Sequence, residues 1–217
     1  MPQDFVLISK RSPKVKAVYN DLMSLLSDVR HDLEAYTFQH QIVGSFKRNL
    51  ITYDQKSNIG FDLDVNIYPN DPEEELTAKE IKLGFKASLD IFARRYGFDY
   101  AEDSTRVLTI KVKDRSRSCI QHSVDFAFVY DYEEKGRPRQ QYIRFQKGQN
   151  NYYWAKQSRG YYKLPEREQW IKKQHLWDEF CEYYIYKKNV NPNPRLHSRS
   201  IFASAAKEFC EQNGYRI

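Results

Sequence analysis

The spacing of apolar residues predicts two amphipathic helices in the first half of the chain. Apolar side chains recur three and four positions apart over residues 14–36 and again over residues 77–97, as on one face of a helix. Ser12 is a candidate cap for the first helix, and Thr77 with Glu80 matches a capping box at the start of the second. The residues of the two apolar stripes are Val15, Val18, Tyr19, Leu22, Leu25, Leu26, Val29, Leu33 and Tyr36, and Ile81, Phe85, Leu89, Phe92 and Tyr96.

Alternation of apolar and polar residues predicts six strands. This period is typical of strands that bury one face and expose the other. A short charged turn separates the third strand from the fourth, so these two are expected to pair as a hairpin, and the last two continue as an antiparallel meander. The predicted strands cover residues 37–43, 61–68, 106–112, 119–130, 140–146 and 152–157.

Two further helices are expected after the last strand. One begins at Pro165 and continues to about residue 187, with Trp170 and Trp177 on its apolar face, and the last covers residues 198–213. The order of elements indicates an α+β fold, a mixed and largely antiparallel sheet flanked by helices, and not a repeating βαβ series. We therefore expect a core domain over residues 1–163 and a short helical subdomain over residues 164–217.

Charge is distributed unevenly along the 217 residues. Residues 1–110 contain 14 Lys and Arg against 17 Asp and Glu, a balance of −3, and residues 111–217 contain 21 against 12, a balance of +9. The basic half also holds all three Trp and most of the Tyr. A basic, aromatic-rich surface suits an anionic ligand with a flat ring, such as a nucleotide or a nucleic acid. A solvated face over an aromatic core accounts for this composition equally well.

Composition argues against secreted and membrane-spanning classes of protein. The three cysteines, Cys119, Cys181 and Cys210, are sparse and have no CxxC spacing, which fits a reducing cytoplasm and neither a disulfide framework nor a zinc cluster. No apolar run approaches the ~20 residues that a membrane helix needs. Residues 1–12 lack an apolar core of signal-peptide length. We expect a cytoplasmic protein with no membrane partner.

Three aspartates in the predicted strands are the main candidates for chemistry. Asp62 and Asp64 lie one residue apart, so both point to one face of their strand while Leu63 points to the core. Asp125 sits likewise between two apolar residues of a later strand. A lone Asp-x-Asp commonly faces solvent, but three aspartates in strand interiors are costly without a partner. If the two strands are neighbours, the three carboxylates are expected to meet within a few ångströms.

Carboxylates that close repel one another unless they are protonated or bridged by cations. Hard oxygen ligands of this kind suit Mg²⁺ or Mn²⁺, and a pair of such ions performs phosphoryl or nucleotidyl transfer. Asp62 and Asp64 are expected to bridge both ions. Asp125 is expected to hold the catalytic ion and to help accept the proton of the attacking hydroxyl.

A Gly-Ser turn after the strand at 37–43 is the candidate phosphate site. Gly44 lets the backbone approach a ligand, and Ser45 adds a hydroxyl beside exposed N–H groups. Lys47 or Arg48 can add positive charge. The five histidines show no paired spacing and are predicted to be structural or exposed, with His122 at most a neighbour of the metal site.

The set of Gly44-Ser45, then Asp62-Leu63-Asp64-Val65, then Asp125 resembles the signature of the polymerase-beta-type nucleotidyltransferase superfamily. The order of elements resembles the branch that contains oligoadenylate synthases, cyclic GMP-AMP synthase and bacterial cyclic-dinucleotide synthases. The likeness covers roughly residues 12–160. The gap of 16 residues between Ser45 and Asp62 is longer than usual in the family, and Phe61 stands where relatives often have Ser.

The resemblance implies further site residues. A lysine of the C-terminal helices contacts the triphosphate in relatives, and Lys172 or Lys173 is the nearest candidate here. An aromatic ring after the sheet stacks on the base, for which we select Tyr153 from a group that also contains Tyr152, Trp154, Tyr161 and Tyr162. About half of these aromatic residues are expected in the core because neighbours along a strand alternate faces.

The sequence therefore predicts a metal-dependent nucleotidyltransferase that moves NMP from an NTP to an acceptor hydroxyl and releases pyrophosphate. In the branch that it resembles, the product is a cyclic or linear oligonucleotide, with a role in antiviral defence. One alternative is an enzyme that modifies a macromolecule or a drug, as toxins and antibiotic-modifying enzymes do. Another is an inactive protein that binds nucleotide or RNA through its basic half. The intact aspartate trio argues against the latter, since a pure binder gains nothing from repelling carboxylates.

Overall fold

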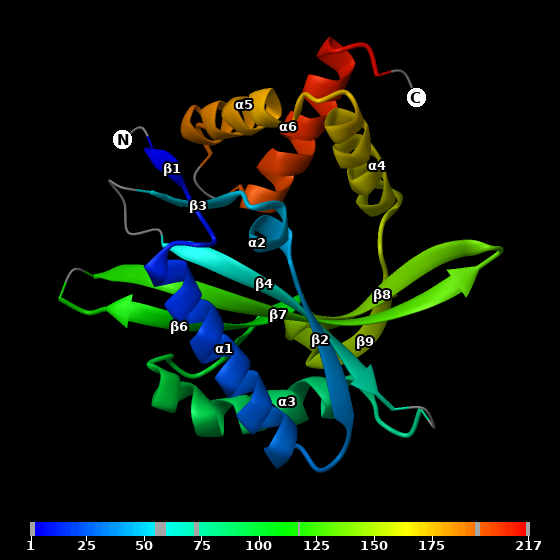
Figure 1. Ribbon diagram of the computed structural model, residues 1–217. Helices are drawn as coiled ribbons and strands as arrows, with labels where there is room; N and C mark the ends of the chain where they lie inside the picture. The colour runs from blue at the N-terminus through cyan, green and yellow to red at the C-terminus, as the bar shows by residue number, and fades with distance from the viewer. Residues whose placement is uncertain (1–2, 55–59, 72–73, 117, 194–195, 216–217) are drawn as a thin grey trace. The chain divides into compact units, whose positions relative to one another are not determined.

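The computed structural model (Figure 1) describes residues 3–54, 60–71, 74–116, 118–193 and 196–215. It divides into two compact units. The larger unit consists of the described residues of Leu7–Tyr53 and Asn58–Gln157. The smaller one consists of those of Met1–Val6, Asp54–Ser57 and Ser158–Ile217.

The larger unit is built on a seven-stranded mixed sheet. Its main path runs in the order β2-β4-β7-β6-β5, and β8 pairs with β7 and with β9. β4 and β7 run parallel, and the other paired strands of this sheet are antiparallel. The predicted mixed, largely antiparallel sheet is therefore confirmed. The strands are β2 Thr37–Val43, β4 Phe61–Asn70, β5 Glu102–Asp103, β6 Val107–Asp114, β7 Cys119–Glu134, β8 Arg137–Gln146 and β9 Asn151–Lys156.

Two helices cover the apolar face of this sheet. α1 (Pro13–Asp32) is capped by the Ser12 hydroxyl, and α3 (Ala78–Phe92) begins with the predicted Thr77 and Glu80 capping box. The apolar stripes of both helices join the inward-facing residues of β4 and β7 in one core. Burying that face on the helices leaves the other face of the strands for polar side chains. The largest members of this core are Phe61, Phe85, Phe98, Phe126 and Phe128.

Local structure differs from the sequence-based expectation at several points. α1 ends at Asp32, four residues early, although Tyr36 is still buried. The mixed, polar composition of residues 46–59 predicts a short helical turn followed by a loop. The structure has the turn as α2 (Gly44–Arg48), but a strand follows it, β3 (Ile51–Asp54), which pairs with an unpredicted β1 (Phe5–Ile8) in a separate two-stranded sheet. The last part of that predicted loop, residues 55–59, lies outside the described residues.

The smaller unit contains three helices where two were predicted. α4 (Arg159–Lys173) begins before Pro165, which lies inside it, and α5 (Trp177–Asn189) is a separate helix. The single helix expected over residues 165–187 is wrong because His175 adopts a left-handed φ of +60° between the two. α6 (Ser198–Gln212) is close to prediction, and Phe180 packs against Phe202 and Phe209.

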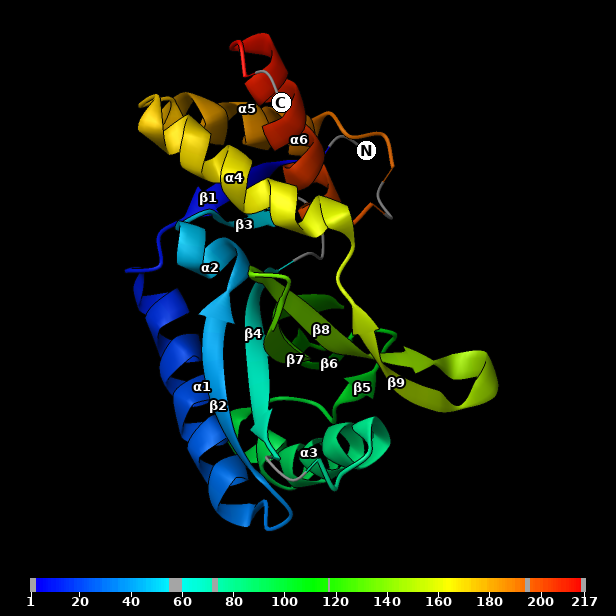
Figure 2. The same cartoon turned by 90° about the vertical axis from the view of Figure 1, so that its right-hand side faces the viewer.

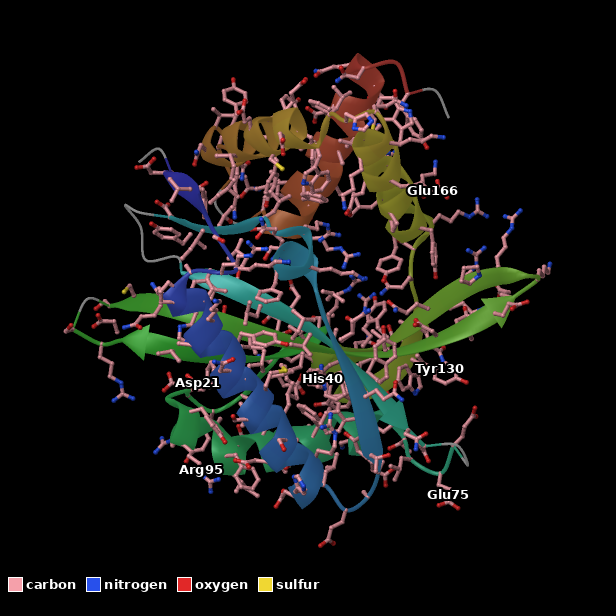
Figure 3. All side chains as sticks on the ribbon, viewed as in Figure 1. Asp21, His40, Glu75, Arg95, Tyr130 and Glu166 are labelled. Carbon is pink, nitrogen blue, oxygen red and sulfur yellow. The ribbon has the colours of Figure 1, made fainter. Side chains whose placement is uncertain are left out.

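The ends of β7 and β8 continue as a two-stranded ribbon, here called the β7–β8 ribbon (residues 129–134 and 137–142). Figure 2 shows it extending past the part of the sheet that α1 and α3 cover. Tyr130, labelled in Figure 3, lies near its base and is 48% exposed. None of the helices that the structure describes has the length and hydropathy to cross a membrane.

Candidate functional site

The three predicted aspartates lie on one face of two adjacent strands. β4 and β7 are parallel neighbours, and their register places Asp64 beside Asp125 and Asp62 beside Ser123. Leu63, Val65 and Val124 alternate with them and are buried in the core on the opposite face. The condition on which the predicted site depended, that the two strands are neighbours, is therefore met.

A hydroxyl from a neighbouring strand holds each of the two outer carboxylates. Thr109 of β6 lies beside Asp125 in the register, and its Oγ1 donates a hydrogen bond of 2.5 Å to Asp125 Oδ1. Ser123 of β7 lies beside Asp62 and donates through its Oγ to Asp62 Oδ1. Sequence reasoning missed both hydroxyls. Ser123 could have been found from alternation alone, because it lies two residues before Asp125 and therefore on the same face of the strand.

Gly44 lies directly against the middle aspartate. Its φ is +63°, and a Cβ built on it would lie 1.8 Å from Asp64 Oδ2 and 2.7 Å from Asp64 Cγ. The next residue, Ser45, has its Oγ 3.5 Å from the backbone oxygen of Asp62. The Gly-Ser turn is thus beside the carboxylates despite its 16-residue separation in sequence, because α2 and β3 take up the intervening chain.

Electrostatics link the three carboxylates. The pKa of Asp125 is raised to about 6, with burial as the largest cause. The charges of Asp62 and Asp64 contribute to the rise, and the Thr109 hydrogen bond and the Lys111 charge oppose it. Lys111 lies on the same face and forms an ion pair of 2.5 Å with Glu102. An excess of negative charge on this face favours a cation there.

The carboxylates do not form a closed metal-binding cluster. Within the described part of the chain, no three His, Cys, Asp or Glu side chains come close enough together to hold an ion. The outer two are turned toward Thr109 and Ser123, which lowers the repulsion between like charges. Their donor set, three carboxylates on one face, still fits a hard divalent cation such as Mg²⁺ or Mn²⁺.

Of the aromatic candidates, Tyr153 is the one that alternation places on the aspartate face. Val129 lies on the same face of β7 as Asp125, and it is paired with Tyr142 of β8, which is paired with Ala155 of β9. Tyr153 is two residues from Ala155 and therefore lies on that same face. Tyr153 is 37% exposed. Tyr152 and Trp154 point to the helix-covered face and pack against the core.

Among the described residues, no observed contact joins the three lysines predicted to bind nucleotide to this site. Lys47 is exposed in α2. Lys172 and Lys173 belong to α4 in the smaller unit, and Lys172 Nζ lies 4.4 Å from the centroid of the Trp177 ring. Their roles in binding triphosphate stay predictions.

Two basic residues, one in the β7–β8 ribbon and one in β9, pair with Glu134 of the ribbon. Lys156 of β9 and Arg139 form ion pairs with Glu134 at 2.7 and 3.5 Å. Lys156 also lies 5.6 Å from the centroid of the Tyr132 ring. These charges are partly compensated within the ribbon, and a nucleic-acid partner for the basic half stays a prediction.

His122 lies on the core side of β7, not in the acidic site. Its ring stacks on Phe61 at 5.5 Å between centroids and meets Phe98 edge-on at 5.5 Å. Its Nδ1 has no hydrogen-bond partner among the described residues. Burial lowers the pKa of His122 to about 4, and the Lys14 charge adds to this effect.

We expect His122→Phe to make the protein less sensitive to acid. The folded pKa of about 4 lies below the usual histidine pKa of 6.5, so between these values the unfolded chain binds a proton that the folded protein does not. His122 should therefore cost stability as the pH falls through this window, on the order of 3 kcal/mol in total. Urea unfolding of wild type and variant near pH 4 and near pH 7.5 measures the difference. His31→Phe, at an exposed helical position, is the control, and an equal acid loss in wild type and His122→Phe would contradict the prediction.

Comparisons with solved structures show what this arrangement is similar to. The fold matches Vibrio cholerae DncV cyclic AMP-GMP synthase with the linear intermediate 5′-pppA(3′,5′)pG at a TM-score of 0.58 and 12% identity, over 94% of this chain and 68% of that one. The 3′-deoxy ATP form of the same synthase matches at 0.54 and 15%, over 90% and 52%. The Bradyrhizobium diazoefficiens CD-NTase CdnG in complex with GTP matches at 0.47 and 13%, over 95% and 50%.

No protein-family model and no curated protein sequence matches the chain. At these identities the likeness establishes the fold alone. The predicted fold, that of polymerase-beta-type nucleotidyltransferases and of the cyclic-dinucleotide synthases within them, is confirmed. The chain spans between half and about two thirds of the length of these neighbours.

Proposed function

We propose that this protein is a metal-dependent nucleotidyltransferase that transfers NMP from an NTP to an acceptor hydroxyl and releases pyrophosphate. One observation carries the proposal: Asp62, Asp64 and Asp125 share one face of adjacent parallel strands, with Gly44 against Asp64. A cyclic or linear oligonucleotide is the product that the structural neighbours favour, because the DncV structures are of a cyclic AMP-GMP synthase. A role in antiviral defence is part of the same proposal.

The proposed chemistry divides among the site residues as follows. Asp62 and Asp64 would hold both divalent ions, and Asp125 would hold the one nearer the acceptor. When bound, such a pair acidifies the attacking hydroxyl and neutralises charge on the triphosphate. The acceptor oxygen forms a bond to the α-phosphorus as the bond to pyrophosphate breaks. Asp125 is also proposed to help accept the proton of the attacking hydroxyl.

Incubation with α-labelled NTPs and Mg²⁺ or Mn²⁺ tests the proposal. We expect pyrophosphate release and label in a small nucleotide product. Label on RNA, protein or a drug would instead identify the macromolecule- or drug-modifying enzyme. Calorimetry that detects NTP binding with no turnover would support the inactive binder. Absence of both NTP binding and turnover would overturn the nucleotidyltransferase assignment.

We expect Tyr153→Ala to weaken NTP binding more than it slows the chemical step. Stacking of a base on an aromatic ring contributes about 1–3 kcal/mol, so KM should rise roughly 5- to 150-fold with kcat little changed. Steady-state kinetics of pyrophosphate release measures both constants. Tyr130→Ala is a matched control, since Tyr130 is also exposed but lies on the opposite face. Equal KM changes in the two variants would rule out Tyr153 as the stacking residue.

A further inference from the structure

Each of the three site carboxylates is restrained by a different neighbour. Asp125 Oδ1 accepts from Thr109 Oγ1, and Asp62 Oδ1 accepts from Ser123 Oγ. Asp64 is confined by the backbone of Gly44, which leaves no room for even a methyl group between them. Ser123 is only 7% exposed, so its hydroxyl is set by the packing of β7 and not by solvent.

Restraint of this kind matters for the choice of metal. Mg²⁺ demands near-ideal octahedral geometry, whereas Ca²⁺ accepts six to eight oxygens in a flexible arrangement that includes bidentate carboxylates. Discrimination between these ions therefore depends on the number and the flexibility of the ligands. A hydrogen bond to a carboxylate limits rotation of the group and keeps it from adapting to a larger ion.

We propose that Thr109 and Ser123 are positioning residues that make this site select Mg²⁺ over Ca²⁺. The inference rests on the proposed metal-dependent function and adds to it the means of metal choice. Both hydroxyls lie at register positions directly beside the carboxylates that they hold. β6 and β7 therefore carry the restraint within the sheet itself.

A merely structural role predicts something different. If the hydroxyls only supplied hydrogen bonds to the carboxylates, their loss would lower the stability of the protein and would weaken the binding of both metals by a similar factor. If they restrain the carboxylates, their loss weakens the binding of Mg²⁺, which needs the restraint, more than the binding of Ca²⁺, which does not. The ratio of the two dissociation constants separates the two roles.

The test measures metal binding in the absence of NTP. Mn²⁺ bound to the full chain is followed by electron paramagnetic resonance, and Mg²⁺ and Ca²⁺ are titrated as competitors. Loss of the supporting hydrogen bond in Thr109→Val or Ser123→Ala is expected to raise the Mg²⁺ dissociation constant about 10- to 100-fold. The Ca²⁺ constant should change by a clearly smaller factor. Thr109→Ser, which keeps the hydroxyl, should retain the preference of the wild type.

Thr105→Val, an exposed threonine in the turn before β6, is the matched control and should leave both constants unchanged. Circular dichroism confirms that each variant is folded, and Ser123→Ala, which also deletes a supporting hydroxyl, keeps the test valid if Thr109→Val does not fold. Equal changes for both metals, or none for either, would overturn the inference while leaving the proposed function intact. A wild-type protein that binds neither Mn²⁺ nor Mg²⁺ would overturn the proposed metal site as well.

Discussion

Replacing Asp62 and Asp64 together by Asn is expected to abolish nucleotidyl transfer while leaving the protein folded. Asn has almost the same shape as Asp, but it removes both negative charges from β4 and with them the attraction for divalent cations. Loss of the groups that stabilise transition-state charge should lower kcat by about 1,000-fold or more. Pyrophosphate release from an NTP measures the effect directly.

The same variant should keep its stability or gain slightly. Asp62 is exposed and Asp64 half-buried, and their charges contribute to the raised pKa of nearby Asp125, as expected for carboxylates that repel one another. Removing two of these charges should leave the free energy of unfolding unchanged or slightly higher. Loss of activity together with loss of folding would not count as support.

Asp131→Asn provides the control on the same face of β7. Asp131 lies six residues beyond Asp125 and accepts a hydrogen bond of 2.7 Å from Gln140 Nε2, so it is an acidic residue of the sheet outside the proposed site. Its variant should keep wild-type turnover and metal binding. Unchanged turnover in the double Asn variant of β4 would show that the metal assignment is wrong.

The acidic face was predictable because strand alternation is strict. Asp62, Asp64 and Asp125 each interrupt an apolar run, and the period of two assigns them to the face opposite the core. Adjacency of β4 and β7 is not a local property, because 48 residues that contain α3, β5 and β6 lie between Asn70 at the end of β4 and Cys119 at the start of β7. Only the fold of the whole sheet brings the two strands together. From the sequence this adjacency was therefore only a condition of the predicted site, and the observed parallel pairing meets it.

The hydroxyl partners could be predicted only in part. Ser123 shares a strand with Asp125, so alternation places it on the acidic face without knowledge of any other strand. Thr109 depends on the register of β6 against β7, which shifts at a bulge between Val112 and Lys113. A shift of one residue moves every side chain to the other face, so the sequence alone could not specify which residue of β6 would reach Asp125.

Conformational breaks were the least predictable features of the chain. The helix at residues 165–187 was predicted as one because its large apolar residues suggest a single face, yet the chain turns at His175 through a conformation that favours glycine. Likewise, the mixed, polar stretch after Ser45 predicts a short helical turn, which agrees with α2, but it gives no sign of β3. In each case packing contacts distant in sequence decide the backbone conformation, and local pattern carries little information about them.

Gly44→Ala is expected to have the largest effect of any single methyl group added to the site. Two costs combine. An alanine at φ +63° is strained by about 1–2 kcal/mol, and its Cβ would lie 1.8 Å from Asp64 Oδ2, a clash that costs a further ~1–3 kcal/mol when the neighbours shift to relieve it. The free energy of unfolding should therefore fall by roughly 2–5 kcal/mol, measured by urea denaturation.

Gly136→Ala isolates the first of these costs. Gly136 has a similar φ of +70°, but nothing lies within 4 Å of a Cβ added there. It should lose only the ~1–2 kcal/mol of backbone strain and keep full activity. The difference between the two variants measures the contact with Asp64. Equal losses of stability would show that Gly44 is required only for its backbone conformation.

Combining Gly44→Ala with Asp64→Ala should restore part of the stability but none of the activity. Removing the Asp64 carboxylate makes room for the new methyl group, so the double variant should be destabilised by less than the sum of the two single changes, an interaction that a double-mutant cycle measures. Activity should be lost in all three variants, because the methyl group displaces the same carboxylate that Asp64→Ala deletes. Gly44 would then be needed at this position because the Asp64 carboxylate occupies the space where a side chain would lie. A Gly44→Ala protein with wild-type turnover would exclude that explanation.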